Sequence, residues 1–174
     1  IFLFSISFEL IAQKAELAFP IGHSEYLSTI ADTADERIIA SGSSGIVILW
    51  DITTGRLINT IETQANQMNL LVSIPLLQGV GYVADNKFFI AEAPKFQPRL
   101  VATVAYGFAP RSIDASKDGK YVFLAGSNFE GQMRCAFIYN IDVSTGAVSV
   151  FYKIPAFGSD PKISEEFREI QVSP

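Results

Sequence analysis

The sequence predicts an all-β fold built from repeated four-stranded antiparallel units. Phe (14 residues) and Tyr (6 residues) far outnumber Met (2 residues), and aromatic and β-branched side chains favour strands. Twelve Gly and eight Pro residues are spread along the 174-residue chain and supply the frequent turns that such a fold requires. Apolar residues nowhere keep a sustained 3.6-residue period, so we expect almost no helix.

Short apolar runs bounded by turn residues follow one another along the chain, as expected of strands. The runs at 38–41 and 46–50 are joined by a Gly- and Ser-rich stretch at 42–45, which predicts a hairpin. The sequence Asp-Ile-Thr-Thr-Gly at 51–55 predicts a turn into the next strand. From there on, strands are expected at 56–61, 70–74, 80–84, 87–91, 100–104, 111–115, 121–125, 134–141 and 147–153.

The strands repeat at a higher level. The acidic turns at 33–37 and 116–120 start 83 residues apart, close to two periods of 40 to 45 residues, the spacing of a four-stranded unit. The turns at 51–55 and 142–146 also match, and each joins a third strand to a fourth. This spacing divides the chain into units at about 22–62, 63–105 and 107–154, with the start of a fourth unit at 163–174.

Residues 22–55 resemble one WD repeat. The stretch opens on Gly22-His23 and closes on Trp50-Asp51, with an acidic turn between them, and this signature at this spacing is typical of that family. The resemblance implies a β-propeller of four-stranded antiparallel blades over residues 13–174. Because a propeller has four to eight blades, the chain would hold an incomplete one, about three blades plus a strand, as the N-terminal part of a longer protein.

The resemblance also implies a hydrogen-bonded chain that locks the first blade. In that family a His, a Ser or Thr, and a Trp are buried together, and by position these would be His23, Ser41 and Trp50. A buried imidazole and a buried indole N–H both need hydrogen-bond partners, which such a chain supplies. The Asp of the family's tight turn is absent, since Ser43 and Ser44 occupy a shorter turn, so we expect the chain of hydrogen bonds to lack one member.

The later units depart further from the family. The unit at 63–104 has neither Gly-His nor Trp-Asp, and Ile141 stands where the third unit would have its Trp. The resemblance to a WD repeat is therefore good over about 34 residues. The next hundred residues show only a looser propeller pattern. The stretch 14–20 would be the outer strand that pairs with the last blade and closes the ring.

The N-terminal residues 1–12 form an apolar run that is followed at once by Gln13-Lys14. Such a run is typical of a signal-peptide core and is too short to span a bilayer as a helix. Its period-two alternation leaves a β-strand as the alternative. The signal-peptide interpretation, with a run that ends as in exported bacterial proteins, predicts a periplasmic or extracellular protein.

The chemistry-bearing residues are few. The net charge is −5 and the 13 Lys and Arg residues are scattered, which argues against nucleic acid as a partner. Cys135 and His23 are the only cysteine and histidine, so an internal disulfide, a cysteine-based metal cage and a second histidine are excluded. We interpret Cys135 as a buried inert thiol and expect no catalytic, cofactor or metal site. The pairs Asp32 with Asp35 and Glu165 with Glu166 are interpreted as solvated turn residues.

The favoured function is a non-catalytic scaffold for a protein or peptide ligand. Propellers present loops around one rim. We expect Tyr26 at the start of the first strand of the first unit and Arg111 at the similar place in the third unit, and both residue types are enriched in interface anchors. The alternative is an accessory propeller of a larger caspase-like peptidase, because residues 12–31 resemble exported bacterial proteins that combine WD repeats with such a domain. Its catalytic domain would then lie beyond residue 174.

Overall fold

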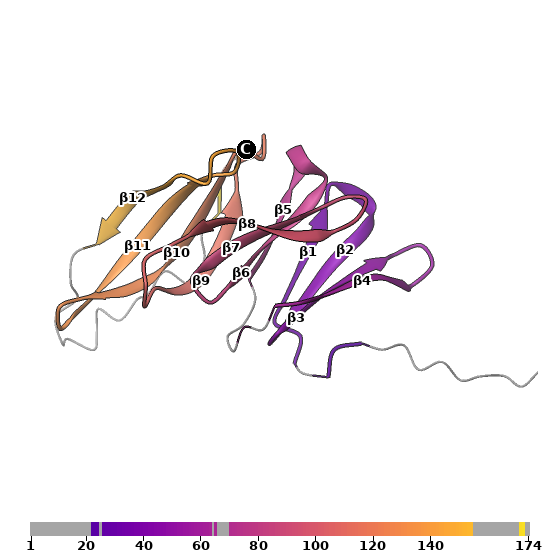
Figure 1. Cartoon of the computed structure of the whole chain (residues 1–174), viewed down its shortest axis with the longest axis horizontal. Helices are drawn as coiled ribbons and strands as arrows, with labels where there is room; N and C mark the ends of the chain where they lie inside the picture. Colours follow the sequence, from indigo (N-terminus) through magenta and orange to yellow (C-terminus); the bar gives the residue numbers. More distant parts are fainter. Residues whose placement is uncertain (1–21, 25, 64, 66–69, 155–170, 173–174) are drawn as a thin grey trace, which may run out of the picture.

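The computed structural model describes residues 22–24, 26–63, 65, 70–154 and 171–172 (Figure 1). In these residues, twelve strands form three four-stranded antiparallel sheets, each made of strands consecutive in the chain. The first sheet holds β1 (Thr29–Thr33), β2 (Asp35–Ser43), β3 (Ile46–Asp51) and β4 (Arg56–Glu62). The second holds β5 (Leu70–Ile74), β6 (Gly79–Ala84), β7 (Lys87–Glu92) and β8 (Gln97–Thr103), and the third holds β9 (Ala109–Ala115), β10 (Tyr121–Glu130), β11 (Met133–Asp142) and β12 (Val148–Ile154).

The three sheets stand side by side in sequence order (Figure 1). Strand β5 packs against both β1 and β9, so the first strands of the three sheets gather along one line. The fourth strands β4, β8 and β12 are each at the far edge of their sheet. The sheets therefore radiate from an axis formed by β1, β5 and β9.

The second sheet is covered on both faces. All six residues of β6 are buried, and alternate side chains point to opposite faces of a strand. Val80 and Tyr82 belong to the apolar core shared with the first sheet. Val83, with Phe88 and Ile90 of β7, belongs to the core shared with the third sheet. This two-sided burial explains why β6 and β7 are nearly continuous apolar runs in the sequence.

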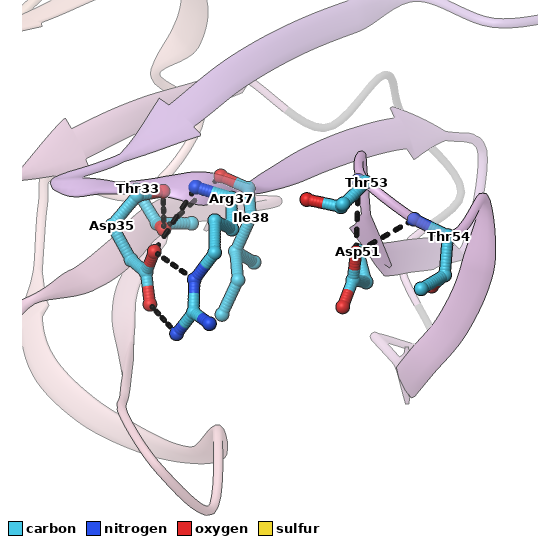
Figure 2. Close-up of polar contacts among 7 residues, drawn as sticks. All are labelled: Thr33, Asp35, Arg37, Ile38, Asp51, Thr53 and Thr54. Carbon is cyan, nitrogen blue, oxygen red and sulfur yellow. Dashed lines mark hydrogen bonds and ion pairs between the residues drawn. The ribbon is translucent and has the colours of Figure 1, made fainter.

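The turns at 51–55 and 142–146 have the same structure, as expected from their sequences. Asp51 accepts hydrogen bonds from the backbone N–H groups of Thr53 and Thr54, both at 2.9 Å (Figure 2). Asp142 accepts the corresponding bonds from Ser144 at 2.9 Å and Thr145 at 2.8 Å. Each carboxylate thus fixes the connection from the third strand of its sheet to the fourth.

The acidic turn expected at 33–37 is shorter than predicted. Strand β2 already begins at Asp35, which pairs with Thr33 at a register shift in β1. The backbone N–H of Arg37 donates to the Asp35 carboxylate at 3.0 Å, and the Thr33 hydroxyl donates to the Ile38 carbonyl at 3.1 Å (Figure 2). The sequence analysis identified strands from apolar runs and therefore missed the beginning of β2, whose first three residues are charged. Backbone pairing does not require apolar residues. The expected signal segment 1–12 and closing strand 14–20 lie outside the described residues.

Candidate functional site

His23, Ser41 and Trp50 are brought together on the first sheet. The Trp50 indole N–H donates to Ser41 Oγ at 2.7 Å, and Ser41 Oγ lies 2.7 Å from His23 Nε2. The other possible acceptor for the Ser41 hydroxyl, the Ile48 carbonyl, is 3.5 Å away. Which of Ser41 Oγ and His23 Nε2 donates the proton depends on the tautomer of the imidazole.

Ser43 is the member of this network that sequence reasoning missed. Its hydroxyl oxygen lies 2.7 Å from His23 Nδ1, within hydrogen-bond distance. The network therefore does not lack a member, because the strand β2 extends to Ser43 and alternation places Ser41 and Ser43 on one face. The sequence analysis placed Ser43 in the hairpin turn at 42–45, whereas the structure places it at the end of β2.

The network ties residue 23 to the sheet and partly buries its imidazole. Burial lowers the pKa of His23 below its ordinary value of 6.5, and a hydrogen bond to the backbone of Ser41 acts in the opposite direction. In Ser-His-Asp triads a carboxylate is hydrogen-bonded to the second imidazole nitrogen, whereas here the Ser43 hydroxyl lies beside it.

Tyr26 lies on the face of the molecule where the inner strands begin. We call this the hairpin face. It is defined by the residues 22–24 and 26–28 before β1, by the connection 104–108 before β9, and by the second-to-third-strand turns at 44–45, 85–86 and 131–132. Tyr26 is 96% exposed and precedes β1 by three residues, rather than lying at its start as predicted. Arg111 is exposed and is the third residue of β9, in the third sheet. Tyr26 and Arg111 therefore belong to different sheets.

Tyr106 is a second exposed aromatic residue on the hairpin face, and the sequence analysis did not single it out. It occupies the connection before β9, as Tyr26 does before β1, and is 95% exposed. Its backbone carbonyl accepts a hydrogen bond from Asn128 Nδ2 at 3.1 Å, so the connection is held while the ring is free to make contacts. A cavity of about 250 Å³ beside it is lined by Asp85, Asn86, Tyr106, Gly107, Phe108 and Ala109.

A second concave surface follows the axis. A groove of about 370 Å³ is lined by the three inner strands and the turns that follow β5 and β9. Its polar side chains include Asp32, Ser73, Asp114 and Lys117. Asp32 was expected to be a solvated turn residue; it is exposed, but it belongs to strand β1 and lines this groove. Asp35 forms an ion pair with Arg37. Local sequence could not predict this groove, because its lining comes from three sheets.

The described residues contain no group of three or more His, Cys, Asp or Glu side chains that could hold a metal ion. Cys135 is a free, buried thiol in the core between the second and third sheets. Glu165 and Glu166 lie outside the described residues. Among the helices that the structure describes, none is long and apolar enough to cross a membrane.

Three consecutive four-stranded antiparallel sheets that radiate from their first strands are blades of a β-propeller, and the described blades form an open array. The chain is similar to the β-propeller domain of Cps50 (Swd1) from Myceliophteria thermophila, with a TM-score of 0.57 and 12% identity over 80% of this chain and 41% of that one. It is also similar to oligogalacturonate lyase from Vibrio parahaemolyticus, with a TM-score of 0.54 and 12% identity over 78% of this chain and 41% of that one.

At 12% identity these likenesses show the fold alone, and the chain spans 41% of the length of each of the two structures. No family model matches the sequence. No curated protein matches it either. The propeller fold is thus established independently of the Gly-His and Trp-Asp residues in the first blade.

Proposed function

We propose that this chain belongs to a non-catalytic, exported scaffold of the WD-repeat type, which binds a protein or peptide ligand on its hairpin face. The observation that carries the proposal is the pair Tyr26 and Tyr106. Both rings are almost fully exposed, and both precede the inner strand of a blade on the same face. The WD-repeat assignment is supported by the hydrogen bonds of His23 and Trp50, and export by the apolar N-terminal run.

Tyrosine is suited to this role. Its ring offers a large contact area with only two rotatable bonds to fix, and its hydroxyl can pair with a polar group of the ligand. The hydrogen bond from Asn128 to the Tyr106 carbonyl reduces the freedom that binding would remove. Arg111, the third residue of β9, adds a positive charge near the hairpin-face end of the third blade. Arginine is enriched among interface anchors.

A peptide library displayed on phage is a suitable probe, because it requires no knowledge of the natural partner. Peptides selected on the immobilised chain would be synthesised, and their Kd values measured by calorimetry against three variants. We expect Tyr26→Ala with Arg111→Ala, and Tyr26→Ala with Tyr106→Ala, to weaken binding at least about tenfold, since each anchor is worth upwards of about 1 kcal/mol.

Tyr121→Ala is the matched control. Tyr121 is an exposed tyrosine at the start of β10, at the opposite end of the sheet from the hairpin face, and should not affect binding. Circular dichroism would establish that all variants are folded. Peptides that bind all variants equally, or whose binding depends on Tyr121, would contradict the assignment of the hairpin face.

A further inference from the structure

The cavity beside Tyr106 lies between two segments of the hairpin face. One is the β6–β7 turn at 85–86, and the other is the connection 104–108 that leads into β9. We call it the Tyr106 cavity; its volume is about 250 Å³. Its described lining consists of Asp85, Asn86, Tyr106, Gly107, Phe108 and Ala109. Asp85 is the only charged residue of this described lining, which includes neither Lys87 nor Arg111.

Hydrogen bonds hold the two segments of the cavity in a fixed arrangement. The backbone N–H of Val104 donates to the Asn86 carbonyl at 2.9 Å. The Asn86 side chain adds a second bond, in which Nδ2 donates to the Val104 carbonyl at 3.0 Å. Further along the connection, the Phe108 N–H donates to the Ala105 carbonyl at 3.2 Å and closes a turn around Tyr106. The walls of the cavity are therefore in place before a ligand binds, which reduces the ordering that binding requires.

Two side chains of the lining have acceptor oxygens without a donor. Because Asn86 Nδ2 donates to Val104, the amide orientation is fixed, and Asn86 Oδ1 accepts no hydrogen bond from the described residues. Asp85 is exposed, and its carboxylate forms neither a hydrogen bond nor an ion pair with any described residue, including Lys87 two positions later. A ligand group that satisfies both acceptors must therefore be rich in N–H donors.

Aromatic rings provide the apolar part of the cavity. Phe108 is only 4% exposed, and its ring meets that of Tyr139 edge to face with centroids 5.0 Å apart. Phe108 is thus a fixed apolar wall, suited to the aliphatic stem of a long polar side chain. The ring of Tyr106 is exposed, and the face of an aromatic ring attracts cations. The cavity therefore combines a carboxylate, a neutral acceptor and an aromatic face.

The corresponding place in the first sheet has the same backbone arrangement without these polar groups. Its turn is Ser44-Gly45, and the Thr63 N–H donates to the Gly45 carbonyl at 2.9 Å, as the Val104 N–H does to the Asn86 carbonyl. Neither residue of that turn has a carboxylate or an amide side chain. The repeated architecture therefore does not require an acid and an amide at this turn, and the second sheet has both.

We propose that the Tyr106 cavity binds an arginine side chain of the protein or peptide ligand. The inference rests on the proposed function, because it names the ligand chemistry that the hairpin face recognises. A guanidinium has several N–H donors in one plane, so it can pair with Asp85 and Asn86 Oδ1 together while its plane stacks on the Tyr106 ring. A lysine ammonium is a point charge and lacks this planar match. The net charge of −5 also favours the approach of a basic ligand.

The test is an NMR titration of the 174-residue chain with N-acetyl-arginine amide at low ionic strength. We expect saturable shifts of the backbone amide signals of Asp85, Asn86 and Tyr106. The Kd should be at least about fivefold lower than for N-acetyl-citrulline amide, which has nearly the same shape but no charge.

Asp85→Asn removes the charge of the cavity and should weaken binding of the arginine probe at least about fivefold. Asparagine tolerates the left-handed backbone at this position, where φ is 55°, so we expect the variant to fold. Glu36→Gln is the matched control. It removes the same charge at the beginning of β2, at the opposite end of the first sheet from the hairpin face, and should leave the Kd unchanged.

Equal binding of the arginine and citrulline probes, or unchanged arginine binding by Asp85→Asn, would overturn the inference. N-acetyl-lysine amide that binds as tightly as the arginine probe would overturn the choice of arginine. If selected peptides depend on Tyr26 and Tyr106 while the arginine probe does not bind, the proposed function stands and the arginine site is rejected. If the arginine probe binds at Asp85 while no selected peptide depends on either tyrosine, the arginine site stands and the proposed function is rejected.

Discussion

Replacing Ser41 with alanine removes the centre of the hydrogen-bonded network of the first blade. The Ser41 hydroxyl is the only atom in the network that contacts both aromatic partners: it accepts a hydrogen bond from Trp50 and is hydrogen-bonded to His23 Nε2, each at 2.7 Å. The substitution keeps the strand and its backbone pairing, because alanine fits the extended conformation of β2. Any loss of stability therefore comes from the two hydrogen bonds and their unpaired partners.

The magnitude follows from those two bonds. Each hydrogen bond contributes a net of about 0.5–1.5 kcal/mol, and an unpaired buried group costs about 1–3 kcal/mol. His23 and Trp50 are only partly buried, so water can replace some of the lost contacts. We expect the free energy of unfolding to fall by about 2 kcal/mol, which for a chain of this size lowers the Tm by about 4–8 °C.

The assay is urea unfolding followed by fluorescence, since Trp50 is the only tryptophan and reports directly on the network. Ser149→Ala, at an exposed position of β12, is the matched control and should change stability by less than about 0.5 kcal/mol. If Ser41→Ala unfolds at the same urea concentration as Ser149→Ala, with an unchanged emission maximum, the network does not stabilise the blade and the reasoning is wrong.

Two further predictions concern pH. Because burial lowers the pKa of His23 below 6.5, the unfolded chain binds a proton before the folded one, so stability should decrease as pH falls through 6.5 and level off below the folded pKa; urea midpoints between pH 7.5 and 5.5 should show this slope, and His23→Gln should lack it. The Ser116 hydroxyl, with the Lys120 backbone N–H, lowers the pKa of Asp118 from 3.8 to about 2, so Ser116→Ala should raise that pKa toward 3.8 in an NMR titration of the Asp118 carboxyl. The wild-type turn should keep its stabilising contacts above pH 3.8 and lose them as pH falls toward 2, and an Asp118 pKa unaffected by Ser116→Ala would contradict this cause.

The sequence predicted the all-β class and the four-stranded repeat because those depend on short-range signals. The turns that begin at Asp51 and Asp142 have a carboxylate placed to accept the backbone N–H groups two and three residues later, and this geometry is local. The second sheet has no such signature and still formed a blade. Its β6 and β7 strands are apolar enough to be covered on both sides.

The features that the sequence did not predict depend on contacts between distant segments. Ser43 joins the network because β2 runs two residues further than expected, and strand ends are decided by pairing with β3. The axial groove and the equivalence of Tyr26 with Tyr106 arise from the placement of three blades around one line. The beginning of β1 at Thr29 was similarly set by its pairing with Gly42.

The burial of the second sheet on both faces has a consequence for how the protein unfolds. A sheet whose two apolar surfaces are each completed by a different neighbour has little stability of its own, so the loss of either neighbour exposes half of its core. Unfolding of the first or the third sheet is therefore expected to destabilise the second sheet through β6. The three sheets should unfold in a single cooperative transition rather than one after another.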